Sequence, residues 1–239
     1  MIPVLLALAG LALTAPPPAL TAPVPAPAAE SAPPPASLPS LPASGETEAE
    51  AIQSVAARRV ADWIAASGDN RSLPYIIVDK QAASLFLFDA RGKSRGRVPV
   101  LIGVAVGDDA TPGVGRKTLA EIGPAEKTTP AGRFLAKYGL AAGRQRVLWV
   151  DYATSVALHP IPTGVSKKER RRQRMLSPTI DDNRITFGCI NVPSAFYSRS
   201  VRPLFQRKGG YVYVLPDTKP LETVFPRLLV QPVMSGGAP

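Results

Sequence analysis

Apolar and polar residues follow two different periods along this chain, and the change falls near residue 70. Between residues 52 and 64 the apolar residues stand three or four positions apart, the period of a helix with one buried face. Thr47 and Glu50 have the spacing of a capping box, and Gly68 is a typical helix end. We therefore predict one amphipathic helix within residues 46–70, with Trp63 as a core anchor.

Short apolar runs separated by turn residues follow from residue 73 onward. They predict strands over 75–78, 84–88, 98–106, 133–138, 145–152, 155–159 and 211–215. Residues 89–96 are expected to be a polar loop, and the clusters of Gly and Pro over 107–115 and 123–132 to be turns. A second helix is predicted over 194–205. Short strands at regular spacing are typical of a mainly β domain.

The first 45 residues differ in composition from the rest. Residues 1–15 are apolar and uncharged, too short to span a bilayer comfortably but suited to the apolar core of a secretory signal. Ala26 and Ala28 form an A-x-A-like cleavage site, so we expect a signal peptide over 1–28 and export of the protein. A disordered Ala/Pro tail on a cytoplasmic protein is the alternative. Residues 29–45 are rich in Pro and Ala and are expected to be an extended linker.

Charge and composition narrow the classes of partner and site. The chain carries 28 Lys and Arg against 18 Asp and Glu, a net charge of +10, which favours nucleic acid, phospholipid or an acidic wall polymer as partner. No zinc-finger spacing or aromatic RNA-binding strand accompanies the charge, so we expect no nucleic-acid partner. One Cys and one His exclude an internal disulfide and a zinc site rich in these residues. We expect no metal and no cofactor.

Residues 160–182 form a long insert without apolar periodicity, and it contains the basic run 167–174. Long loops inside a compact domain often act as lids, so the run could be a basic flap over a site for an anionic polymer. A solvated helix end is an equally good interpretation.

The only cysteine, Cys189, and the only histidine, His159, are the candidate reactive residues. An inert buried thiol and a core histidine are the alternatives. The local sequence favours chemistry, because Gly188 permits a sharp turn whose N–H groups can face an oxyanion. A helix starting just beyond the cysteine would also favour the thiolate. We expect His159 to act as base for a Cys189 nucleophile.

Residues 186–191, Thr-Phe-Gly-Cys-Ile-Asn, resemble the signature of the L,D-transpeptidase (YkuD-type) catalytic domain, in which Ser/Thr-His-Gly-Cys-x-Asn/Arg is usual. The similarity extends over about residues 74–215. It implies a β-sandwich catalytic domain over 71–218, with one N-terminal helix, a helix after the cysteine, and a C-terminal extension over 219–239.

The resemblance also implies roles for individual residues. Cys189 would be the nucleophile and His159 its base, oriented by a backbone carbonyl such as that of Pro160. The substrate pocket would be shaped by Thr186, Phe187, Gly188 and Asn191. Members of this family work on peptidoglycan stem peptides outside the cytoplasmic membrane, which implies a periplasmic enzyme. They release the terminal D-Ala, form a thioester, and transfer the acyl group to an amine of another stem or of a protein.

Two departures from the family pattern keep alternatives open. Phe187 stands where a second histidine is usual, and the insert lengthens the separation between His159 and Cys189. Hydrolysis of the thioester would make the protein an L,D-carboxypeptidase or an amidase, and loss of activity would leave a wall-binding module. A serine penicillin-binding enzyme is disfavoured, because the chain contains no Ser-x-x-Lys.

Overall fold

The structure is a computed structural model, and it describes residues 54–141, 145–165 and 167–229. The predicted signal peptide over 1–28, the predicted linker over 29–45 and the start of the predicted first helix lie outside these residues. None of the described helices is long and apolar enough to cross a membrane.

The predicted amphipathic helix is present as α1, Val55–Ser67, but it begins later than the sequence indicates. Ser54 has an extended backbone and accepts a hydrogen bond from the N–H of Ala57, so it caps the helix. The capping-box spacing of residues 47–50 therefore does not mark the start of α1. The predicted end is correct: Gly68 is left-handed, and its N–H binds the carbonyl of Ile64.

Ten strands within the described residues confirm the mainly β prediction. Eight of them form one sheet in the order β3-β2-β1-β10-β5-β6-β7-β9, and β4 pairs with β8. Their bounds are β1 Tyr75–Asp79, β2 Ser84–Phe88, β3 Ser94–Pro99, β4 Ile102–Gly103, β5 Gly132–Leu140, β6 Arg146–Asp151, β7 Val156–Pro160, β8 Arg184–Thr186, β9 Ile190–Val192 and β10 Gly210–Val214. The pairs β1–β10, β7–β9 and β4–β8 are parallel, and the others are antiparallel.

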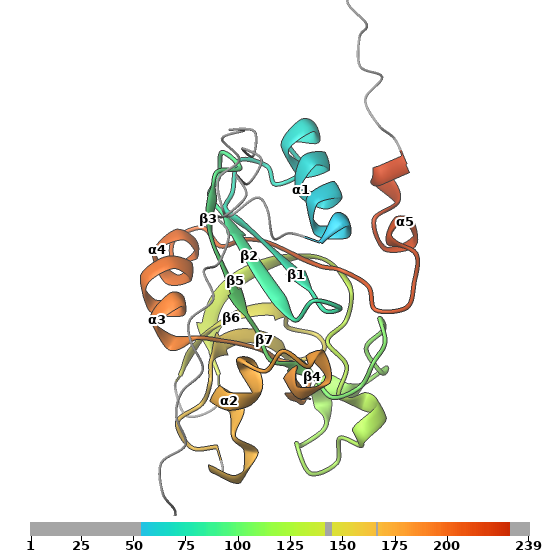
Figure 1. The fold of residues 1–239 in the computed structure, drawn as a ribbon, viewed down its shortest axis with the longest axis vertical. Coiled ribbons are helices and arrows are strands. Elements are labelled where there is room, and N and C mark those ends of the chain that lie inside the picture. Colours follow the sequence, from blue (N-terminus) through green and yellow to red (C-terminus); the bar gives the residue numbers. More distant parts are fainter. Residues whose placement is uncertain (1–53, 142–144, 166, 230–239) are drawn as a thin grey trace, which may run out of the picture. The chain divides into compact units, whose positions relative to one another are not determined.

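Strands β1, β2 and β10 are buried on both faces, which explains why they are almost wholly apolar. Alternate residues of these strands contribute to two separate cores. One core joins Ile76 and Leu85 to Leu148 and Ile190 of the other half of the sheet, as in a sandwich. The second core joins Tyr75, Ile77, Phe86 and Tyr213 to the buried face of α1. Figure 1 shows β1 and β2 between α1 on one side and α3 and α4 on the other.

The predicted helix after the cysteine is confirmed. It consists of α3 Ser194–Phe196, a π-helical turn Tyr197–Val201, and α4 Arg202–Phe205. Its side chains Tyr197, Val201 and Phe205 pack into the first core.

Other boundaries differ from the predictions. The strand predicted over 98–106 is divided into β3 and β4, and β3 begins inside the predicted polar loop. β3 is an edge strand that pairs only with β2, so it tolerates exposed polar residues. The turn segments contain the short 3-10 helices η1 Val114–Arg116 and η2 Pro124–Glu126.

The insert and the C-terminal segment are both helical in part. The insert contains η4 Lys167–Glu169, α2 Arg171–Met175 and η5 Ile180–Asn183. The C-terminal segment contains α5 Leu221–Val224 and η7 Pro226–Leu229. Phe225 and Leu228 of that segment pack into the second core together with α1.

Candidate active site

The parallel pair β7–β9 brings the only histidine beside the motif that holds the only cysteine. His159 lies opposite Asn191, and Leu158 lies opposite Ile190. The side chains of Leu158, Ile190 and Val192 enter the first core. Because side chains alternate across a sheet, His159 and Asn191 share the other face. Cys189 immediately precedes β9, and its thiol contacts the carbonyl of Ser155, the residue before β7. The long insert therefore leaves the two strands adjacent.

The turn before Cys189 requires glycine. Gly188 has φ of 121°, and a Cβ atom there would lie 2.7 Å from the carbonyl oxygen of Thr128. The hydroxyl of Thr186 donates to the carbonyl of Cys189 at 2.6 Å and accepts from the N–H of Gly188 at 3.2 Å. Thr186 thus closes the turn from within. The N–H of Gly188 is engaged in this bond, so it is not one of the free oxyanion donors that the sequence led us to expect.

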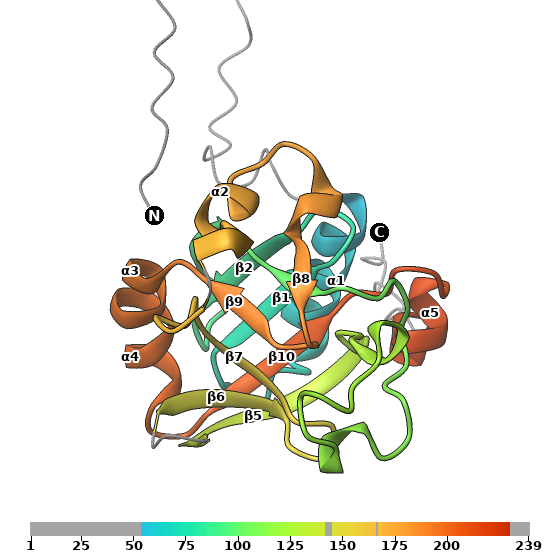
Figure 2. The ribbon, with the colours of Figure 1, turned by 90° about the horizontal axis from the view of Figure 1, so that it is seen from below.

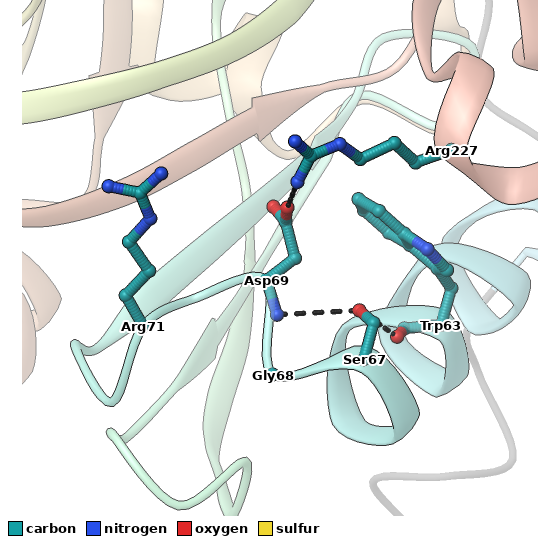
Figure 3. Close-up of a pocket in the computed structure, with 6 residues that line it drawn as sticks. All are labelled: Trp63, Ser67, Gly68, Asp69, Arg71 and Arg227. Carbon is teal, nitrogen blue, oxygen red and sulfur yellow. Dashed lines mark hydrogen bonds and ion pairs between the residues drawn. The ribbon is translucent and has the colours of Figure 1, made fainter. Parts of the chain in front are cut away.

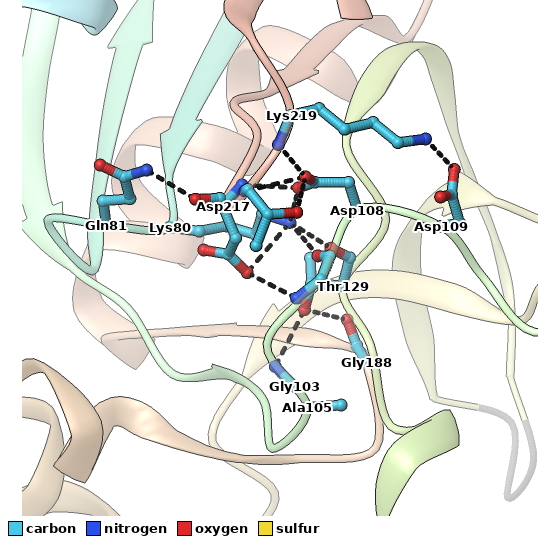
Figure 4. Close-up of polar contacts among 12 residues, drawn as sticks. Lys80, Gln81, Gly103, Ala105, Asp108, Asp109, Thr129, Gly188, Asp217 and Lys219 are labelled. Atoms are coloured by element: carbon cyan, nitrogen blue, oxygen red, sulfur yellow. Dashed lines mark hydrogen bonds and ion pairs between the residues drawn. The ribbon is translucent and has the colours of Figure 1, made fainter.

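A buried lysine is connected to the turn through Thr129 (Figure 4). Lys80 is 0% exposed, and its Nζ donates to the carbonyls of Thr129 at 3.0 Å and Gly107 at 2.6 Å. The same Nζ forms ion pairs with Asp108 at 3.0 Å and Asp217 at 3.3 Å. The sequence places Lys80 in a turn and does not reveal this network.

Two further contacts complete the support. The hydroxyl of Thr129 donates to the carbonyl of Gly188 at 2.8 Å and accepts from the N–H of Gly103 at 2.9 Å.

Burial alone would raise the pKa of Asp108. Hydrogen bonds from the N–H groups of Asp217 and Lys219 and from Lys80 nevertheless hold that pKa well below its usual value. Asp108 is therefore a fixed anion that balances the buried ammonium group.

Cys189 is partly exposed, and its thiol donates to the carbonyl of Ser155 at 3.7 Å. Burial raises the pKa of the thiol, against the opposing effects of a hydrogen bond with the backbone of Ala157 and the positive charge of Arg171. The expectation that the following helix keeps the thiol ionised therefore does not hold. Helix α3 begins only at Ser194 and has three residues.

His159 has a defined hydrogen-bonding arrangement. Its Nδ1 lies 2.7 Å from the carbonyl oxygen of Pro160, and its Nε2 lies 3.5 Å from Nδ2 of Asn191. A carbonyl only accepts hydrogen bonds, so we assign the proton to Nδ1 and leave Nε2 as the acceptor. Burial lowers the pKa of His159, the bond to Pro160 opposes this, and the charge of Arg171 lowers it further. The hydrogen bonds and the lowered pKa both favour the neutral imidazole, with a lone pair on Nε2 that faces the amide of Asn191.

Asn191 is 0% exposed and is held by an arginine from the insert. Nη1 of Arg171 donates to Oδ1 of Asn191 at 2.7 Å, and its Nε donates to Glu169 at 2.5 Å. Figure 2 shows α2, which Arg171 begins, beside β9. The sequence did not single out Arg171, because nothing in the basic run distinguishes it from its neighbours.

Phe187 lies on the surface, 37% exposed, and does not join the contacts of His159. Nζ of Lys127 lies 3.9 Å from the centre of its ring, which is cation–π geometry. Phe187 and Lys127 therefore form an aromatic and cationic pair in front of the glycine turn.

Two pockets border different parts of the domain. One, of about 470 Å³, follows the end of β7 and is lined mainly by the insert. Its lining is Ile161, Pro162, Thr163, Val165, Lys167, Arg170, Arg171, Arg172, Gln173 and Ser194. The other, of about 440 Å³, lies at the end of α1 and contains none of the candidate site residues (Figure 3). Within the part of the chain that the structure describes, no group of three His, Cys, Asp or Glu side chains could hold a metal ion.

No protein-family model and no curated protein matches this chain. Solved structures do resemble its fold. The L,D-transpeptidase from Xylanimonas cellulosilytica matches at 15% identity with a TM-score of 0.35, over 59% of this chain and 60% of that one. The helical cell shape determining protein Pgp2 from Campylobacter jejuni matches at 15% identity with a TM-score of 0.41, over 66% of this chain and 56% of that one.

The catalytic domain of the L,D-transpeptidase from E. faecium matches at 18% identity with a TM-score of 0.33, over 59% of this chain and 95% of that one. This chain spans less than two thirds of the Xylanimonas cellulosilytica and Campylobacter jejuni structures that it matches. Several of the structures similar to this chain are L,D-transpeptidase catalytic domains, the family that the cysteine motif resembles.

Proposed function

We propose that this chain is a peptidoglycan L,D-transpeptidase that works through a thioester on Cys189. The observation that carries the proposal is the pairing of β7 with β9, in which the only histidine lies opposite Asn191, two residues after the only cysteine. The hydrogen bond from Nδ1 of His159 to the carbonyl of Pro160 supports it, because it leaves Nε2 unprotonated. A neutral imidazole with an unprotonated Nε2 is what a general base requires.

The reaction begins from a neutral thiol and a neutral imidazole. The thiol of Cys189 leaves the carbonyl of Ser155 and turns toward His159 when substrate binds. His159 takes the thiol proton while the sulfur attacks the carbonyl of the L-centre of the stem-peptide diamino acid. The C–N bond to D-Ala breaks, and the imidazolium returns the proton to the leaving amine. A thioester on Cys189 remains.

An acceptor amine completes the cycle. It attacks the thioester carbonyl and gives a proton to His159, and the C–S bond breaks as the thiol is re-formed. Transfer to another stem gives a cross-link, and transfer to a protein gives an attachment. Attack by water in place of the amine gives the carboxypeptidase or amidase. Thr186 and Gly188 support the proposal by holding the turn that presents the thiol.

The insert supplies the proposed contact with an anionic wall polymer. The pocket of about 470 Å³ is lined by Lys167, Arg170 and Arg172, and it continues from the end of the strand that holds His159. Stem peptides and wall polymers carry carboxylate or phosphate groups, which arginine binds through its planar fork. A role in the periplasm, after export, agrees with this partner.

The test is an intact mass measurement after incubation with a disaccharide tetrapeptide. The wild-type chain should gain the mass of the acyl donor minus D-Ala, and the Cys189→Ala and His159→Ala variants should not. A cross-linked dimer among the products would identify transfer, and a free tripeptide would identify hydrolysis. The proposal is wrong if the wild-type chain never forms an adduct but still binds purified peptidoglycan, which would indicate a wall-binding module.

A further inference from the structure

Arg171 connects the insert to the candidate base through a single side chain. Its Nη1 lies 2.7 Å from Oδ1 of Asn191, and Nδ2 of the same amide lies 3.5 Å from Nε2 of His159. The Arg171 side chain is 10% exposed, and Glu169 holds its Nε. The guanidinium group is thus fixed by two contacts rather than free in solvent.

The Arg171 contact determines which way the Asn191 amide faces. A guanidinium group only donates hydrogen bonds, so the oxygen of the amide must face Arg171. The NH₂ group of Asn191 then faces His159. It meets Nε2 as a donor, and this arrangement favours the form of the imidazole in which Nε2 carries no proton.

The second contact of the ring favours the same form. The carbonyl of Pro160 accepts from Nδ1, so both neighbours of the imidazole require a proton on Nδ1 and a lone pair on Nε2. The positive charge of Arg171 adds to this effect, because it opposes a second positive charge on His159. The orientation of the Asn191 amide and the charge of the Arg171 guanidinium group therefore both favour a neutral His159 with its proton on Nδ1.

We propose that Arg171, contributed by the insert, is a positioning residue for the catalytic base: through Asn191 it holds His159 in the tautomer that can accept the thiol proton. The proposal rests on the proposed function, in which His159 is the base. It assigns to the insert a part in building the site, in addition to any contact with substrate.

The chain offers a direct readout, because it contains one histidine and one cysteine. The imidazole nitrogens of ¹⁵N-labelled protein report the tautomer and the pKa of His159 without substrate. The wild-type chain should show the neutral form with the proton on Nδ1. In Arg171→Met, which removes both donor and charge, the tautomers should mix and the pKa of His159 should rise. Acylation by a tetrapeptide stem should slow by about 10-fold to 100-fold, as for other misplaced catalytic groups.

Two further variants separate positioning from mere anchoring of the insert. Arg174 lies on the same helix and also ties the insert together, but its hydrogen bonds go to the carbonyls of Asp182 and Arg184. Arg174→Met should leave the imidazole signals unchanged. Arg171→Gln keeps a donor and removes the charge, so it should raise the pKa of His159 while retaining the Nδ1–H tautomer. It also serves as the test if Arg171→Met does not fold.

Unchanged imidazole signals in the folded Arg171 variants would overturn the proposal. Equal changes of the imidazole signals in Arg174→Met would also overturn the proposal, since anchoring of the insert alone would then explain the changes seen in the Arg171 variants. These outcomes are independent of the mass test. A wild-type chain without an acyl adduct would refute the proposed function, whereas the imidazole signals would still show whether Arg171 sets the state of His159.

Discussion

Thr129 donates its hydroxyl to the carbonyl of Gly188 at 2.8 Å, so the residue before the candidate nucleophile is held by a side chain from a distant turn. The same hydroxyl accepts from the N–H of Gly103. Thr129→Val keeps the shape of the side chain but leaves a buried carbonyl and a buried N–H without partners. We expect a loss of about 1–3 kcal/mol in the free energy of unfolding, measured by urea denaturation. Thr223→Val, on an exposed position of α5, is the control and should change it by less than about 0.5 kcal/mol.

Gly188→Ala should damage both the fold and the site. The new Cβ atom would lie 2.7 Å from the carbonyl oxygen of Thr128, and the backbone φ of 121° disfavours any side chain. We expect a loss of about 1–3 kcal/mol in the free energy of unfolding and failure to acylate Cys189. Gly164→Ala is the matched control, because nothing lies within 4 Å of a Cβ atom there. Equal stability of the two variants would contradict the geometry of the turn.

Lys80→Met should be among the most destabilising substitutions in the domain. It removes the buried ammonium group that pairs with Asp108 and Asp217, so two carboxylates are left without their cation. We expect a loss of about 3–5 kcal/mol, seen as a lower midpoint in thermal and urea unfolding. Lys219→Met removes a lysine that pairs at the surface with Asp109, and it should cost no more than about 1 kcal/mol. A small effect at Lys80 would show that Thr129 holds its position without it.

Alkylation of the single thiol should follow an elevated pKa. Burial raises the pKa of Cys189, so the thiolate fraction near neutral pH is smaller than that of an ordinary thiol with a pKa of about 8.5. Iodoacetamide labelling followed by mass spectrometry should therefore be slow at pH 7 and should accelerate only as the solution becomes alkaline. A free cysteine peptide under the same conditions provides the reference. Rapid labelling below pH 7 would instead indicate a preformed thiolate and imidazolium pair.

The acidic limb of the acylation rate should lie at low pH. The base must be neutral, and burial lowers the pKa of His159 below its ordinary value of about 6.5. Activity should therefore persist as the pH falls below that value and disappear only as the pH passes through the lowered pKa of the folded state. Single-turnover acylation measured from pH 4 to pH 8 tests this. An acidic limb above pH 6.5 would mean that His159 is more easily protonated than its surroundings indicate.

Local patterns predict most of the strands, and they single out His159 and Cys189 as the candidate reactive residues. The short apolar runs over 75–78, 84–88 and 211–215 identify β1, β2 and β10, because these strands are buried on both faces and contribute one face to each core. The turn at Gly188 follows from the wide backbone freedom of glycine, and the position of His159 near a strand end follows from the apolar run that precedes it. The start of edge strand β3 was predicted wrongly as a polar loop, because its exposed polar residues have the pattern of a loop.

The supporting residues of the site could not be predicted, because their roles depend on contacts between distant segments. From the sequence, Lys80 is predicted to be an ordinary lysine in a turn. Its role depends on Asp108, Thr129 and Asp217, which contact its Nζ only in the folded chain. In the sequence, Arg171 is one member of a basic run. Its role follows from its hydrogen bond to Asn191, which forms only when the insert folds. Charge that is exposed and charge that is buried look alike in a sequence, and only the tertiary structure separates them.

Strand β10 has a consequence for the order in which this domain can fold. It is the last strand along the chain, yet it lies between β1 and β5 and pairs with β1 in parallel. A chain that emerges with its N-terminus first cannot complete the middle of its sheet until residues 210–214 have followed. Closing so long a loop before the contacts form should make folding slow. Under the export proposed above, this delay would keep the chain unfolded while it passes through a membrane.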